Sequence, residues 1–257
     1  MKNVIVDSKS NIISMEIIFN DEPNDWKNTS LETYLIDNTP SGWSDFFNRE
    51  NITDYIHTIS NFLRHEASHD NITIYPNISN VFRALYMIHP EDIDLVVIGQ
   101  DPYHDGAATG LAFDVANEHR PNPSLRNIIK ELDSCGFKTN GHLTHWPEQG
   151  ILLINTALTV RKASPESHTE IWNQFTEELI GYIGNREKLV WLLMGSHAQS
   201  YAKMLPNGKK HVVIKTTHPS PLSAYRSTKT TPAFIGSDCF RTINEELLKL
   251  GKSPIKF

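Results

Sequence analysis

The stretch Leu95-Val96-Val97-Ile98-Gly99-Gln100-Asp101-Pro102-Tyr103-His104 decides the fold expected for this chain. An apolar run opens it, and polar and ring-bearing residues follow at once. A run this short and this apolar is typical of a strand buried on both faces, as in a parallel sheet. In open parallel sheets the ligand crevice lies outside the carboxyl ends of the strands. We therefore expect residues 100–104 to lie at a functional edge.

Other apolar runs end in the same abrupt way. Residues 151–154 stop at Asn155, residues 190–194 stop at Gly195, and residues 212–214 lead on to His218. Helical patterns separate these runs, and alternating strands and helices indicate a doubly wound sheet. The predicted fold class is α/β, a single domain with a central four-stranded, mostly parallel, twisted sheet flanked by helices. Four strands are too few for an eight-stranded barrel.

The helices are predicted from apolar spacing and end signals. Asn80 is expected to start a helix, Thr169 to cap one, and Ser124 to be a helix N-cap. The predicted helical segments are residues 51–63, 81–88, 123–135, 169–182, 197–205 and 241–249.

Residues 1–40 form an N-terminal extension with weak patterning, and residues 41–257 form the main domain. The extension is expected to hold a short strand around residues 12–19 or to be partly disordered. No apolar run is long enough for a membrane span, and the N-terminus carries no apolar signal region. Cys135 and Cys239 lie far apart in the sequence, so a reduced, intracellular protein is expected, in the nucleus or the cytoplasm and not secreted.

The net charge of −6 is unevenly distributed. Residues 1–50 contain four basic and nine acidic residues, whereas residues 199–257 contain ten basic and three acidic residues. A local basic face suits contact with phosphate, but a merely solvated basic surface explains the charge equally well. His142 and His145 lack further ligands nearby, so no metal and no cofactor are expected.

Several collinear motifs together resemble the family 1 uracil-DNA glycosylases, over roughly residues 41–257. They are Gly99–His104, residues 110–113, residues 123–125, residues 153–161 together with residues 193–199, and residues 218–226. The resemblance implies the fold described above, with residues 41–257 as the catalytic domain of a monomeric hydrolase. It also implies release of uracil from single- or double-stranded DNA, leaving an abasic site for base excision repair.

The resemblance assigns three catalytic residues. Cleavage of an N-glycosidic bond builds positive charge on the sugar and negative charge on the departing base. Asp101 would orient the attacking water and stabilise the sugar cation, with His104 beside that water. His218, as a neutral imidazole, would donate to uracil O2. Taken alone, Asp101 would more often be a turn cap and His218 a packed histidine.

Uracil binding falls to Gln100, Tyr103, Phe113 and Asn155 by the same resemblance. The Asn155 amide can pair with N3–H and O4 of uracil, whereas cytosine presents the reversed pattern. Phe113 would stack on the extruded base, and Tyr103 would exclude the methyl group of thymine.

DNA binding is implied for a further set of residues. Leu222 would fill the stack vacated by the flipped nucleotide, and Arg226 would hold the backbone near it. The remaining candidates are Ser124, Ser196 and Ser220 for phosphates, and Tyr225.

The chain departs from the family pattern in three places. Residues 104–109 are one residue shorter than usual and lack a proline, and the proline-rich stretch before Ser124 is reduced to residues 121–123. About six extra residues, 227–232, follow Arg226. We expect this insertion to enlarge the DNA-facing loop and to add contacts through Lys229.

Two other functions fit parts of the sequence. A DNA-binding accessory protein could share this fold, although intact Asp101, Asn155 and His218 argue against it. A glycosylase that accepts mismatched thymine is disfavoured by Tyr103. The family is also the target of a small acidic protein inhibitor that mimics DNA, so such a partner is expected. The loop altered by residues 227–232 argues against inhibitor binding.

Overall fold

The central sheet consists of four parallel strands in the order β5 (Ile151–Asn155), β4 (Leu95–Gly99), β7 (Val190–Met194) and β8 (Val212–Thr216). The computed structural model describes residues 3–6, 12–16 and 26–257. Gly99 pairs with Asn155, and Met194 pairs with Thr216. Since the strands are parallel and in register, all four carboxyl ends meet at one edge, which confirms the predicted fold class.

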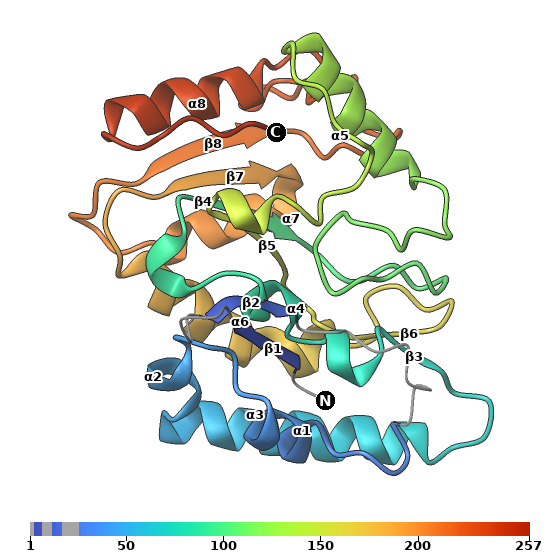
Figure 1. The fold of residues 1–257 in the computed structure, drawn as a ribbon. Helices are drawn as coiled ribbons and strands as arrows, with labels where there is room; N and C mark the ends of the chain where they lie inside the picture. Colours follow the sequence, from blue (N-terminus) through green and yellow to red (C-terminus); the bar gives the residue numbers. More distant parts are fainter. Residues whose placement is uncertain (1–2, 7–11, 17–25) are drawn as a thin grey trace.

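Helices cover the sheet in two groups (Figure 1). In this view α5 (Pro123–Ser134) and α8 (Cys239–Lys249) lie at the top, near β7 and β8, whereas α6 (Thr169–Gly184) and α3 (Glu50–Ala67) lie below the sheet. The remaining elements are the helices α1 (Leu31–Asp37), α2 (Ser44–Phe47), α4 (Arg83–Tyr86) and α7 (Gly195–Ser200), the 3-10 turns η1 (Ile78–Asn80), η2 (Pro90–Asp92), η3 (Pro147–Gln149) and η4 (Tyr201–Met204), and the strands β1 (Asn3–Val6), β2 (Ile12–Glu16), β3 (Ile74–Tyr75) and β6 (Val160–Arg161).

The hydrophobic core follows from the strand sequences. Every residue of β4, β5 and β7 is buried, as the continuous apolar runs predict. The expectation that all four strands are buried on both faces is wrong for β8, where residues 212–214 are only half-buried and Lys215 is exposed. β5 and β8 are both edge strands, yet β5 is fully buried, so the exposure of β8 reflects what packs over its end of the sheet and not its edge position alone.

Several predicted helix boundaries are corrected by the structure. The helix predicted over residues 81–88 is reduced to the single turn of α4, and Asn80 belongs to η1. Thr169 and Ser124 are not N-caps, because α6 starts at Thr169 behind His168, and α5 starts at Pro123 behind Asn122. Proline at the first helical position needs no hydrogen-bonded N–H, which favours the earlier start of α5. The helix predicted over residues 197–205 is α7 followed by η4.

The N-terminal region is described in part. β2 lies within the strand expected around residues 12–19 and pairs antiparallel with β1, while residues 17–19 lie outside the described residues. Trp26 and Leu31 are buried, and the indole of Trp26 donates to the carbonyl oxygen of Pro76 at 3.3 Å. Packing against the main body therefore begins before residue 41.

Candidate active site

The carboxyl ends of β4 and β5 are joined by hydrogen bonds that fix Gln100 and Asn155 side by side. The N–H groups of Thr156 and Ala157 both donate to the carbonyl oxygen of Gln100, at 3.1 and 2.8 Å. The Asn155 side chain is 7% exposed and lies against the main chain of Gly99. Within residues 26–257 its amide makes no hydrogen bond, so the oxygen and the NH2 group are both available to a ligand.

Asp101 follows β4 as a half-buried carboxylate. Its Oδ2 accepts a hydrogen bond from the N–H of Glu166 at 2.8 Å. Burial raises the pKa of Asp101 above its usual range, and the nearby Glu166 carboxylate adds to the rise. The Glu166 N–H and His104 act in the opposite direction on the pKa. A desolvated carboxylate of this kind is suited to stabilising a cation that forms beside it.

His104 lies on the same loop as Asp101 and is exposed. The carbonyl oxygen of His104 accepts from the N–H of Ala163 at 3.0 Å. The segment between β6 and α6 therefore contacts the loop of residues 101–104 twice, once at Asp101 and once at His104.

His218 follows β8, and its hydrogen bonding determines its protonation. The N–H of Ser220 donates to His218 Nδ1 at 3.0 Å, so Nδ1 carries no proton. Burial lowers the pKa of His218, and His197 lowers it further. His218 is therefore a neutral imidazole whose Nε2–H remains as a donor.

His197, on α7, links the two sides of the site. Thr156 donates its hydroxyl proton to the carbonyl oxygen of Gln100 at 2.9 Å and accepts from His197 Nε2 at 2.7 Å. Burial lowers the pKa of His197, whereas Glu166 and Asp101 raise it. Asp101 follows β4, His197 follows β7 and His218 follows β8, so these three residues lie at the same, carboxyl end of the parallel sheet.

The aromatic residues approach the same place. The rings of Phe113 and His218 have centroids 5.9 Å apart, and the Tyr103 hydroxyl donates to the carbonyl oxygen of Phe113 at 3.4 Å. Burial raises the pKa of Tyr103, so its hydroxyl keeps its proton. Phe113 adopts a φ of +66°, which is unusual for a bulky residue and is typical of functional sites.

The segment after His218 forms a hydrogen-bonded turn with an apolar tip. The N–H groups of Ser223 and Ala224 donate to the carbonyl oxygen of Ser220 at 3.0 and 2.8 Å. Leu222 at the tip is 83% exposed, so its side chain is open to contact by a ligand. Tyr225 and Arg226 are also exposed, and Lys130 of α5 lies over the Tyr225 ring at 5.2 Å.

The three candidate serines lie at different places on this edge. Ser196 is exposed in the first turn of α7, and Ser220 is half-buried in the turn after β8. Ser124 lies at the start of helix α5. This helix is linked to the turn after β8, because the Asn127 side chain donates to the carbonyl oxygen of Pro219 at 2.7 Å. Asp101, Asn155 and His218 thus lie at the carboxyl edge of the sheet, whereas Ser124 lies on α5, which is linked to the turn after β8 through Asn127.

Sequence reasoning missed the roles of His197, Thr156 and Glu166. His197 and Thr156 each follow a strand end, and this position was the signal that could have found them. Glu166 gave no signal, because its main-chain N–H makes the contact. No group of three His, Cys, Asp or Glu side chains in the described part of the chain could hold a metal ion. Nor does any helix there have the length and apolar character needed to cross a bilayer.

Comparisons with known proteins agree with this geometry. The model of the Uracil DNA glycosylase superfamily matches residues 87–248. A uracil-DNA glycosylase of Pseudomonas aeruginosa is 40% identical over 221 residues, covering 84% of this chain and 92% of the relative. That of Haemophilus influenzae is 42% identical, covering 83% and 97%. The crystal structure of a mimivirus uracil-DNA glycosylase superposes with a TM-score of 0.80 at 29% identity, covering 90% of each chain. A similar match is a mimivirus variant in complex with UGI.

Proposed function

Because the chain belongs to the uracil-DNA glycosylase superfamily, we propose that it hydrolyses the N-glycosidic bond of deoxyuridine in DNA. The products are free uracil and an abasic site, as in base excision repair. The observation that carries the proposal is that Asp101 follows β4 and His218 follows β8, so that both lie at the carboxyl end of the parallel sheet. The Asp101 carboxylate suits the sugar cation, and the neutral His218 imidazole suits the uracil anion.

Charge separation in the transition state defines the catalytic roles. The Asp101 carboxylate stabilises the positive sugar and orients the attacking water, with His104 beside it. The Nε2–H of His218 donates to uracil O2 as negative charge builds there. A neutral imidazole stabilises this anion without having to transfer its proton.

Base recognition rests on Asn155, Phe113 and Tyr103, with Gln100 beside them. The free amide of Asn155 donates to O4 and accepts from N3–H of uracil, whereas cytosine would leave these groups unpaired. Phe113 stacks on the flipped base, and Tyr103 stands where thymine carries its methyl group.

The surface around Leu222 is the proposed DNA-binding surface. Leu222 enters the vacated stack, while Ser124, Ser196, Ser220, Tyr225 and Arg226 contact the backbone. A mimivirus relative forms a complex with UGI, so we expect a DNA-mimicking inhibitor to bind the same surface here. Since the substrate is DNA, we place the protein inside the cell.

The decisive test is uracil release from a labelled single-stranded oligonucleotide in EDTA. We expect release by the wild type and a loss of about a hundredfold or more in Asp101→Asn and His218→Leu. A DNA-binding accessory protein would bind the oligonucleotide and release nothing. Release of thymine from G·T mismatches at the rate of uracil from G·U would contradict the role of Tyr103.

A further inference from the structure

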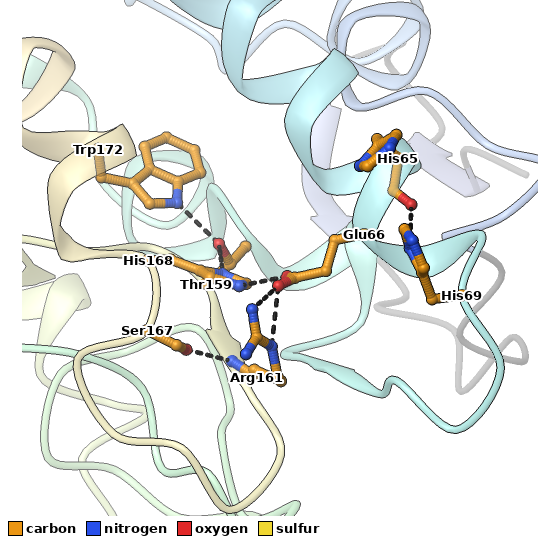
Figure 2. Close-up of polar contacts among 8 residues, drawn as sticks. All are labelled: His65, Glu66, His69, Thr159, Arg161, Ser167, His168 and Trp172. Carbon is orange, nitrogen blue, oxygen red and sulfur yellow. Dashed lines mark hydrogen bonds and ion pairs between the residues drawn. The ribbon is translucent and has the colours of Figure 1, made fainter.

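Glu66, near the end of α3, is a buried carboxylate outside the site described above. Its side chain is 6% exposed and lies between β6 and α6 (Figure 2). Oε1 accepts from Arg161 Nε at 2.8 Å and also from Arg161 Nη2, while Oε2 accepts from His168 Nε2 at 2.6 Å. One carboxylate thus holds two residues that are 95 and 102 positions further along the chain.

The partners of His168 continue the chain of hydrogen bonds. The indole N–H of Trp172 donates to Thr159 Oγ1 at 2.7 Å, and Thr159 Oγ1 lies 2.8 Å from His168 Nδ1. Burial lowers the pKa of His168 even though Glu66 raises it, so the imidazole is neutral. Its one proton therefore lies on Nε2, toward Glu66, and Thr159 donates to Nδ1. The side-chain polar groups of Glu66, Thr159, His168 and Trp172 all have partners, which fixes one arrangement.

The two residues held by Glu66 mark the two ends of residues 162–167. This segment makes both contacts to the active-site loop, from Ala163 to the carbonyl oxygen of His104 and from Glu166 to Asp101 Oδ2. Ala163 and Glu166 have φ values of +57° and +65°, which non-glycine residues adopt only when surrounding contacts hold them. Within the segment, Ser167 Oγ accepts from the Arg161 N–H at 2.8 Å.

We propose that Glu66 is a positioning residue for uracil excision: by holding Arg161 and His168 it fixes residues 162–167, so that the N–H of Glu166 donates to the Asp101 carboxylate. The inference rests on the proposed function for its kinetic consequence, but the contacts that carry it are independent of that function. Glu66 itself touches none of the candidate catalytic side chains.

The test compares Glu66→Gln with the wild type in two measurements. Glutamine keeps the size, but its NH2 group faces a donor, so Arg161 or His168 loses its partner. We expect single-turnover uracil release to slow by about tenfold to a hundredfold, because the carboxylate is misplaced. Binding of uracil-free DNA should stay unchanged. In the absence of DNA, the pKa of Asp101 measured by carbon-13 NMR should rise, because the hydrogen bond that favours its charged form is weakened.

The charged and titratable groups that face Asp101 are Glu166, His104 and His197, and all three are kept in this variant. Ile59→Val is the matched control, since it removes a buried methyl group from the same helix without touching the network. It should lower Tm and leave both the rate and the Asp101 pKa unchanged. If Glu66→Gln does not fold, Arg161→Gln replaces it as the test variant. The Arg161 side chain is 40% exposed, so its substitution disturbs the core less.

A folded Glu66→Gln or Arg161→Gln protein with the wild-type rate and the wild-type Asp101 pKa would overturn the inference. So would a slower rate with an unchanged Asp101 pKa, since packing alone would then explain it. Absence of uracil release by the wild type would instead refute the proposed function, and the NMR measurement would still decide the role of Glu66.

Discussion

The side chain of Asn155 lies directly against Gly99, so that a Cβ on Gly99 would come within 2.1 Å of Asn155 Oδ1. The two residues are paired across β4 and β5, and this contact fixes the amide that we propose reads the base. Gly99→Ala should therefore displace the amide and slow uracil release by about a hundredfold. Initial rates on uracil-containing and cytosine-containing oligonucleotides measure both the loss of uracil release and any loss of discrimination between uracil and cytosine.

Gly181→Ala is the control for this substitution. A Cβ on Gly181, in α6, meets no atom within 4 Å. Alanine in a helix interior is favoured over glycine by up to about 1 kcal/mol, so Tm should stay or rise and release should stay unchanged. Wild-type release and selectivity in Gly99→Ala would show that the amide is not held by this contact.

Asn155→Asp should extend the reaction to cytosine. The NH2 group that pairs with uracil O4 becomes an oxygen, which accepts from the exocyclic amino group of cytosine. Uracil release should fall, and cytosine release from a cytosine-containing single strand should become measurable by chromatography of the free base. Failure to detect any cytosine would weaken the assignment of Asn155 as the base reader.

Asp101→Asn should be inactive and more stable than the wild type. The folded-state pKa of Asp101 is raised mainly by burial, so the folded protein binds its proton more tightly than the unfolded chain. Above the raised pKa, the charged Asp101 carboxylate therefore lowers the free energy of unfolding. This destabilisation disappears as the pH falls through the raised pKa. Asparagine removes the destabilisation and can still accept from the Glu166 N–H.

Thermal unfolding at several pH values checks this prediction. The Tm of Asp101→Asn should exceed that of the wild type near pH 8, and the gap should narrow on acidification. Asp133→Asn, at an exposed position on α5, should show no such gap. Uracil release should fall by at least about a hundredfold. A lower Tm for Asp101→Asn at every pH would refute the argument.

Much of this arrangement could be predicted from the sequence because it is local. Each apolar run ends at or within two residues of a strand end, and Asp101, Asn155 and His218 lie at or within two residues of those ends. Parallel pairing then brings the ends together without further information. For this reason the fold class was predicted correctly, whereas the family was predicted from the collinear motifs.

What could not be predicted depends on contacts between distant segments. The half-burial of β8, in contrast to the fully buried edge strand β5, depends on which segments pack over each end of the sheet, and apolar periodicity does not report this. The contact of Glu66 with Arg161 and His168 spans about a hundred positions and involves residue types that are usually exposed. The hydrogen bond to Asp101 comes from a main-chain N–H, for which no side-chain pattern exists.

Glu166→Gln should let the enzyme work at lower pH. The Glu166 carboxylate raises the pKa of Asp101, whereas its main-chain N–H lowers it, and the substitution removes only the first effect. The Asp101 pKa should fall, so the acidic limb of the single-turnover rate profile should move to lower pH. Removing an exposed negative charge beside the DNA path should also tighten DNA binding at low salt.

Glu170→Gln is the matched control, because Glu170 is an exposed carboxylate in the first turn of α6, close to Glu166 in the sequence. It should leave the acidic limb unchanged. If the acidic limb of the rate profile lies at the same pH in Glu166→Gln and in the wild type, the Glu166 side chain does not influence the pKa of Asp101.

The inserted segment, residues 227–232, is anchored at its C-terminal end, closed by an internal hydrogen bond, and exposed at its tip. Pro232 accepts from the Thr217 N–H at 2.9 Å, and the Thr228 N–H donates to the carbonyl oxygen of Thr231 at 2.8 Å. Lys229, at the tip, is exposed and follows the turn that carries Leu222. We predict that Lys229 contacts a DNA phosphate. Lys229→Ala should weaken binding uniformly across sequences and reduce the slope of log K against log salt by about 1.

The control for Lys229 is Lys210, an exposed lysine that precedes β8 and so lies at the opposite, amino end of that strand. Lys210→Ala should leave the salt slope unchanged. Deleting the whole insertion would be a poorer test, because the Pro232 carbonyl helps to hold Thr217, next to His218. Fluorescence anisotropy with a labelled abasic duplex over a range of salt concentrations gives both slopes. Equal slopes for the wild type and Lys229→Ala would exclude a phosphate contact, and the insertion would then have no electrostatic part in DNA binding.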